Sequence, residues 1–118
     1  MSKVSMVIAG EPCSKANSRR IVKSRAGAPM VIKSKKALGY VKMFHEQCKK
    51  MDPLLDGDLS VTIKIYYKSR RPDLDESLIL DVMQGFVYKN DRQVKEKHIY
   101  WGGVDKENPR AEIIVRHL

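Results

Sequence analysis

Residues 71–94 of this 118-residue chain read RPDLDESLILDVMQGFVYKNDRQV, and this stretch indicates both the fold and the chemistry. Its apolar residues recur every three or four positions, which predicts a short amphipathic helix over residues 75–86. The apolar stripe comprises Ile79, Val82, Met83 and Phe86. The stretch is also rich in carboxylates, although the whole chain has a formal net charge of +9. Its acidic residues are Asp73, Asp75, Glu76, Asp81 and Asp91.

Two of these carboxylates, Asp73 and Asp75, stand two residues apart just before the predicted helix. In an extended segment, residues i and i+2 point to the same side, so both carboxylates would lie together while Leu74 points into the core. Neighbouring carboxylates repel each other unless they share a proton or a cation. The D-x-D pattern therefore predicts a cation site. The alternative is that these acids cap the helix, which explains one aspartate well and two less well.

A third carboxylate, Asp91, follows the predicted helix in the segment YKNDRQV. It can reach the first pair only if the next segment folds against the strand that precedes Asp73, which the sequence permits. Three hard oxygen ligands without a nearby His or Cys suit Mg²⁺, or Mn²⁺, better than zinc. Metal ligands combined with basic residues that bind a phosphate backbone are expected of a phosphodiesterase.

The rest of the chain alternates between strand-like and helix-like patterns. Residues 57–69 alternate apolar and polar side chains, which predicts a strand. Residues 34–51 repeat apolar residues every three or four positions, which predicts a helix with Ser34 as its N-cap. Further strands are predicted over residues 3–12, 19–24, 29–34, 92–103 and 110–118, the second and third forming a hairpin. This order predicts one α+β domain over residues 1–118, with a mixed or antiparallel sheet and two helices packed on one face.

Charge is distributed unevenly along the chain. Residues 1–50 contain 12 Lys and Arg and 2 acids, whereas residues 51–118 contain 11 Lys and Arg and 12 acids. The first segment therefore has a net charge of +10 and the second a net charge of −1. This asymmetry indicates a polyanionic partner, most often nucleic acid, although such residues also serve simply as a solvated surface. The candidate backbone-binding residues are Lys15, Arg19, Arg20, Arg70, Arg71 and Lys89.

The two cysteines and the hydropathy bear on the cellular setting. Cys13 and Cys48 form neither a CxxC pair nor a disulfide framework, so we expect both to be reduced in a cytosol. The sequence has no signal-peptide pattern and no apolar run of membrane-spanning length. We therefore expect a cytoplasmic protein without a membrane partner.

These segments together resemble the RusA family of Holliday-junction resolvases, many of which are encoded by phages and prophages. The segment RRPDLDESLILDVMQGFVYKNDRQV is similar to the family's order of a basic residue, D-L-D-N-L, a helix and D-D-x-Q-V. The opening segment VIAGEPCSKANSRR is similar to the family's first strand and the basic segment after it. The resemblance covers nearly the whole chain, and its motifs are fairly specific in this order and spacing.

The resemblance implies a Mg²⁺-dependent homodimer that makes paired cuts in four-way DNA junctions during recombination and repair. By position, Asp73 and Asp75 match the D-L-D pair, and Asp91 matches the second acid of D-D-x-Q-V. These three residues would be the catalytic metal ligands. Asp81 matches an aspartate of the family's helix and ranks below them as a ligand.

The sequence also departs from the family pattern. Glu76 replaces the usual asparagine, and the interval leading to the helical aspartate is shorter than usual. The family commonly carries a lysine one turn into this helix, where this chain has Ile79. Arg70, Arg71 or Lys89 could supply the missing charge. A non-catalytic branched-DNA-binding protein is therefore the main alternative. A small RNA-binding protein is a weaker one, because the sequence has no RNA-binding aromatic motif or G-x-x-G loop.

Overall fold

A computed structural model describes residues 3–14, 17 and 19–118. Four strands form one sheet in the order β1-β6-β4-β5. Their bounds are Lys3–Ala9 for β1, Leu59–Tyr67 for β4, Val94–Val104 for β5 and Arg110–His117 for β6. β6 pairs antiparallel with both β1 and β4, whereas β5 runs parallel to β4. The predicted α+β class with a mixed sheet is confirmed.

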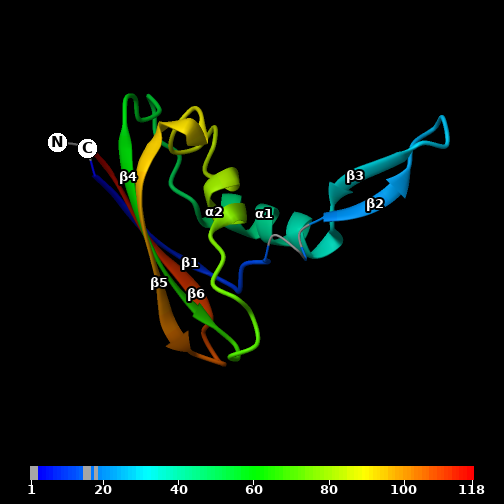
Figure 1. Ribbon diagram of the computed structural model, residues 1–118. Coiled ribbons are helices and arrows are strands. Elements are labelled where there is room, and N and C mark those ends of the chain that lie inside the picture. Colours follow the sequence, from blue (N-terminus) through cyan, green and yellow to red (C-terminus); the bar gives the residue numbers. More distant parts are fainter. Residues whose placement is uncertain (1–2, 15–16, 18) are drawn as a thin grey trace.

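Two helices lie on one face of this sheet, as predicted (Figure 1). α1 spans Lys35–Gln47, and its N-cap is the predicted Ser34, whose hydroxyl accepts a hydrogen bond from the Ala37 N–H. It is shorter than predicted because Cys48 adopts an extended conformation and ends it. α2 spans only Ser77–Val82. Neither these helices nor any other formed by the described residues is long and apolar enough to cross a membrane.

The hydrophobic core lies between the helices and the sheet face that they cover. The alternating pattern of β4 correctly predicts its inward-facing side chains, which are all buried: Leu59, Val61, Ile63, Ile65 and Tyr67. α1 adds Tyr40 and Phe44 to this core, and α2 adds Ile79. β4 therefore lies at the centre of the molecule, with a strand on either side and helices above it.

A separate two-stranded hairpin projects away from the sheet and the helices (Figure 1). It consists of β2 (Arg19–Lys23) and β3 (Pro29–Lys33), which pair antiparallel as predicted. Within the described part of the chain, no side chain of this hairpin belongs to the hydrophobic core. Local pairing rather than packing therefore holds it together.

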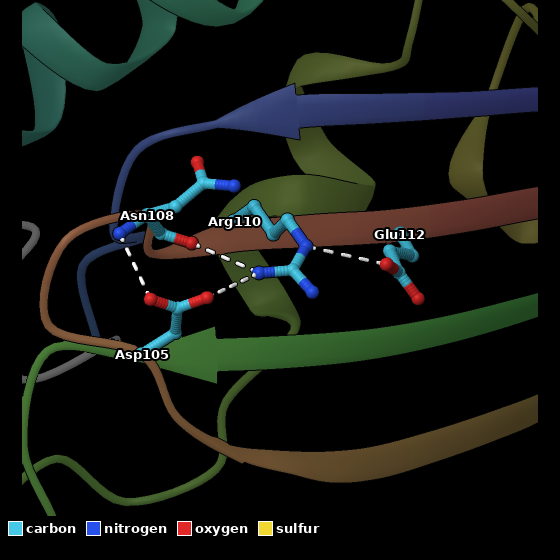
Figure 2. Close-up of polar contacts among 4 residues, drawn as sticks. All are labelled: Asp105, Asn108, Arg110 and Glu112. Atoms are coloured by element: carbon cyan, nitrogen blue, oxygen red, sulfur yellow. Dashed lines mark hydrogen bonds and ion pairs between the residues drawn. The ribbon is translucent and has the colours of Figure 1, made fainter.

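The turn between β5 and β6 is fixed by Arg110, the first residue of β6 (Figure 2). Its guanidinium donates to the Asp105 carboxylate at 2.9 Å, to the Asn108 carbonyl at 3.1 Å and to the Glu112 carboxylate at 3.2 Å. The guanidinium also lies 3.8 Å from the centre of the Tyr66 ring, in a cation–π contact. This network fixes the end of the sheet at which β4 also ends, and hence the start of the segment that carries the D-x-D pair.

Candidate functional site

The loop between β4 and α2, residues 68–76, carries the D-x-D pair and is called the acidic loop below. It is held by Tyr67, the last residue of β4, which is 1% exposed. The Tyr67 hydroxyl donates to the Asp73 carbonyl at 3.2 Å and accepts from the Asp75 N–H at 3.3 Å. Burial raises the pKa of the Tyr67 phenol, so the hydroxyl stays protonated at neutral pH. One buried hydroxyl thus fixes the backbone of both aspartates.

Asp75 also begins α2. Its side-chain Oδ1 accepts a hydrogen bond from the N–H of Ser77, the first helical residue, at 2.9 Å. Asp75 therefore satisfies one N–H at the start of α2, although the N-cap position itself is Glu76, whose side chain makes no capping hydrogen bond. Asp75 is half-buried, whereas Asp73 is exposed. Capping does not exclude metal binding, because a carboxylate has two oxygens that can each accept more than one contact.

The position of Leu74 contradicts its predicted place in the core. Leu74 is 37% exposed, although the extended D-x-D pattern predicts that it points inward between the carboxylates. The prediction was wrong because the chain does not continue as an extended strand here: the Asp75 side chain accepts the Ser77 N–H and closes a turn into α2. The acidic loop needs no hydrophobic anchor there, since the Tyr67 hydroxyl already holds its backbone.

Glu11 brings a third carboxylate to the acidic loop from the segment after β1. Its Oε2 accepts the Lys68 N–H at 2.7 Å. A pocket of about 310 Å³ opens beside this contact, and its charged and polar lining residues are Glu11, Ser14, Asn17, Lys36, Arg71 and Asp73. Two carboxylates and two cations therefore line one small space. The sequence reasoning missed Glu11 and Lys36, although Glu11 is one of only two acids in residues 1–50.

Asp81 and Asp91 form a second acidic group around a different tyrosine. Gln84 links them, because its Nε2 donates to the Asp81 carboxylate at 3.1 Å and its Oε1 accepts from the Asp91 N–H at 3.0 Å. Asp91 is the first residue of a short 3₁₀ helix, η1 (Asp91–Gln93), which directly precedes β5. Burial raises the pKa of the nearby Tyr88 phenol, and the charges of Asp91 and Asp81 raise it further.

Asp91 and the D-x-D pair are connected to different ends of β4. β5 does fold against β4, but the pairing is parallel, so the start of β5 lies beside the start of β4. Asp91 precedes the start of β5, whereas Asp73 and Asp75 follow the end of β4. Within the described ranges, no three side chains of His, Cys, Asp or Glu come close enough together to hold a metal ion. A site that unites Asp91 with the D-x-D pair therefore stays a prediction.

Comparison with known families accounts for this combination of fold and acidic loop. Residues 9–116 match the family described as Endodeoxyribonuclease RusA, which is nearly the whole chain. The chain belongs to the RusA family. The predicted enzyme class, an endodeoxyribonuclease of the Holliday-junction resolvase kind, is thereby confirmed. No curated protein gives a significant match to the chain.

Basic side chains reach both acidic groups of this RusA domain from neighbouring elements. Lys97 of β5 contacts the Glu76 carboxylate at 2.9 Å, directly after the D-x-D pair. Lys33, the last residue of β3, lies 3.5 Å from the Asp81 carboxylate. The helix position at which the resemblance leads us to expect a lysine is occupied by Ile79, which is fully buried in the core. Positive charge near the acids therefore comes from β3, β5, α1 and the acidic loop, and not from α2.

The backbone-binding residues predicted for this RusA domain lie in three regions: the hairpin, the acidic loop and the turn before η1. Those that the structure describes are all exposed, as contact with DNA phosphates requires: Arg19, Arg20, Arg70, Arg71 and Lys89. Arg71 also lines the pocket beside the acidic loop. Lys15 lies outside the described residues.

Proposed function

We propose that this RusA endonuclease is a Mg²⁺-dependent, structure-selective enzyme that resolves four-way DNA junctions by paired phosphodiester cleavage in recombination and repair. The observation that carries the proposal is the D-x-D pair, whose backbone a buried tyrosine fixes beside a pocket lined by carboxylates and cations. The carboxylates favour a metal ion and the cations favour a phosphate, which together suit a phosphodiester substrate. We place the reaction in the cytoplasm.

The side chains of the acidic loop suit a hard divalent cation. Mg²⁺ prefers oxygen ligands, usually takes one or two carboxylates, and fills its other positions with water and substrate phosphate. Asp73 and Asp75 would hold the ion, Asp91 is the proposed third ligand, and Asp81 ranks below it. When bound, the ion would lower the pKa of a water molecule and offset negative charge on the phosphate. Mn²⁺ could serve in the same place.

Other residues of the chain would position the DNA for cleavage. The Tyr67 hydroxyl holds the D-x-D backbone before substrate binds, which limits the reorganisation needed during the reaction. Lys36 and Arg71 line the pocket beside the acidic loop and would bind phosphate oxygens. Lys97, held by its ion pair at the end of this loop, would add positive charge close to the reacting phosphate.

A homodimer suits a four-way junction. The junction has approximate two-fold symmetry, and a C₂ dimer presents two copies of one site to two opposed strands. Paired cleavage would then consist of one cut by each protomer. Analytical ultracentrifugation of the protein with junction DNA tests this part of the proposal. We expect one dimer to bind each junction. A junction that binds a single protomer and is still cleaved would refute the proposed dimer.

The proposed reaction is tested by cleavage of an end-labelled, immobile four-way junction with Mg²⁺ and with EDTA. The key variant is Asp75→Asn, which keeps an oxygen for the Ser77 N–H and therefore retains the helix cap while losing the charge. We expect symmetric nicks that require Mg²⁺ and disappear in this variant. Asp58→Asn, an exposed acid just before β4, is the matched control and should cut normally.

A family member that has kept binding but lost cleavage is the second candidate. The observation that favours it is Ile79, because a buried apolar side chain stands where the resemblance leads us to expect a lysine. Tight binding of the junction without cuts, unchanged in Asp75→Asn, would establish this candidate. The same result would refute the proposed reaction.

A further inference from the structure

The β2–β3 hairpin, residues 19–33, is strongly basic and is called the basic arm below. The sequence contains no acidic residue from position 12 to position 45. The arm itself carries Arg19, Arg20, Lys23, Arg25 and Lys33. It projects from the body of the protein, and the molecule with the arm is 50 Å long (Figure 1). At its base, Lys33 pairs with Asp81 at 3.5 Å, while the other cations of the arm are exposed.

One face of the basic arm has an apolar centre between charged ends. Ile21 and Val31 lie opposite each other and are 74% and 61% exposed. Because strand side chains alternate between faces, this pair shares its face with Arg19, Lys23 and Lys33. An isolated two-stranded hairpin is at best marginally stable in water. A partner that covers these exposed β-branched side chains would therefore stabilise the hairpin.

We propose that the basic arm binds in the major groove of duplex DNA, with its cations on the phosphates and the Ile21–Val31 pair against the base edges. A two-stranded β-ribbon fits the major groove, which is about 12 Å wide. Charge complementarity selects DNA over a second copy of this arm, since two arms without acidic residues repel each other. The inference rests on the proposed function for the choice of DNA, and it adds a duplex-binding element outside the acidic loop.

The first test compares two double variants that lose the same charge. Arg19→Ala/Lys23→Ala removes two cations from the proposed DNA-binding face, and Lys3→Ala/Lys106→Ala removes two exposed cations outside the arm. Binding to a linear duplex, with the sequence of one junction arm, is measured over a series of KCl concentrations. Each phosphate contact contributes about 0.9 to the slope of log affinity against log salt. We expect the arm variant to lower this slope by about two and the control to leave it unchanged. Equal slopes for both variants would overturn the proposal.

The second test separates groove contact from phosphate contact. Ile21→Thr/Val31→Thr keeps two β-branched side chains but replaces an ethyl group of Ile21 and a methyl group of Val31 with hydroxyls. We expect duplex affinity to fall about fourfold for each residue, with the salt slope unchanged. Unchanged affinity would refute the groove contact.

The third test removes the basic arm by replacing residues 20–32 with a short Gly-Ser linker. The described arm contributes no side chain to the core, so the remainder should keep its circular dichroism spectrum and melting temperature. We expect duplex binding to be at least tenfold weaker. We also expect the oligomeric state, measured by sedimentation, to be unchanged. A shift from dimer to monomer would show that the arm joins protomers and would overturn its role in DNA binding.

These experiments can refute the proposed role of the arm and the proposed reaction independently of each other. Arm-dependent binding to linear duplex, combined with no cutting of junctions by the intact protein, would support the arm and refute the reaction. Normal junction cutting, combined with a duplex salt slope that the arm variant does not change, would support the reaction and refute the arm's role in DNA binding.

Discussion

Replacing Tyr67 with phenylalanine removes one oxygen atom from beneath the acidic loop and leaves the ring in place. The hydroxyl makes two hydrogen bonds to the loop, at 3.2 and 3.3 Å, and such bonds contribute about 0.5–1.5 kcal/mol each. Both distances are long for a tyrosine hydroxyl, so we expect the free energy of unfolding to fall by about 1–2 kcal/mol. The ring should keep its stacking on Trp101, whose centroid lies 5.0 Å away. The larger effect should be on catalysis, because a shift of about 1 Å in reacting groups can lower a rate about 100-fold.

Two measurements on Tyr67→Phe separate stability from catalysis. Urea unfolding gives the free energy of unfolding, and single-turnover cleavage of a junction gives the rate of the chemical step. We expect this rate to fall about 10- to 100-fold while junction affinity stays unchanged. Tyr66→Phe is the matched control, since Tyr66 is the neighbouring residue of β4, lies against Arg110 and should leave the rate unchanged. A stable Tyr67→Phe protein that cuts at the normal rate would refute the positioning role of this hydroxyl.

Three further predictions follow from contacts around the site. Lys97→Ala should lower kcat roughly 10- to 100-fold with little change in stability, since its ion pair is half-exposed, and Lys95→Ala is the kinetic control. Gly102→Ala should destabilise the fold by about 1–3 kcal/mol in urea, because the new Cβ would lie 2.8–2.9 Å from the Tyr66 ring; a normal unfolding curve would contradict this packing. Burial raises the pKa of Tyr88, so the unfolded chain loses this proton first, near pH 10, and stability should fall as pH rises above that value. The free energy of unfolding, measured from pH 8 to 11, should fall less steeply with pH in Tyr88→Phe than in the wild type. The same pH dependence in both proteins would contradict this prediction.

The sequence predicts those elements whose periodicity is set by a single buried face. β4 alternates so regularly that all five of its inward side chains are predicted correctly. α2 is predicted too long, because Phe86 continues the apolar stripe although the chain has already left the helix. Gly85 has a φ of +84°, a left-handed conformation typical of a helix end, and this glycine is a stop signal that the periodicity outweighed. Phe86 instead stacks on His45 of α1, with ring centroids 4.0 Å apart.

The acidic loop is predictable in part, because the D-x-D spacing and the helix that follows are local features. Its supporting residues are not predictable, since Tyr67, Glu11 and Lys97 reach it from elements whose relative positions depend on packing. The parallel direction of β5 is a further example. Alternation along a strand shows which side chains face the core, but it does not fix the direction of the neighbouring strand. That direction decides where Asp91 lies relative to the D-x-D pair.

The basic arm of the base-rich half stands apart from the sheet, and an ion pair at its base joins it to α2. The acid-rich half forms most of the sheet and both acidic groups, whereas the base-rich half forms α1 and the basic arm. Lys33 ends the arm and pairs with Asp81 at 3.5 Å, but a half-exposed ion pair contributes only about 0–1 kcal/mol. The Ser34 hydroxyl adds one hydrogen bond to the Asn17 carbonyl, at 2.8 Å, worth about 1 kcal/mol. Because these contacts are weak, we expect DNA binding to be able to turn the arm at its base. A few phosphate contacts therefore suffice to reorient it on DNA without disturbing the core on which the acidic loop is built.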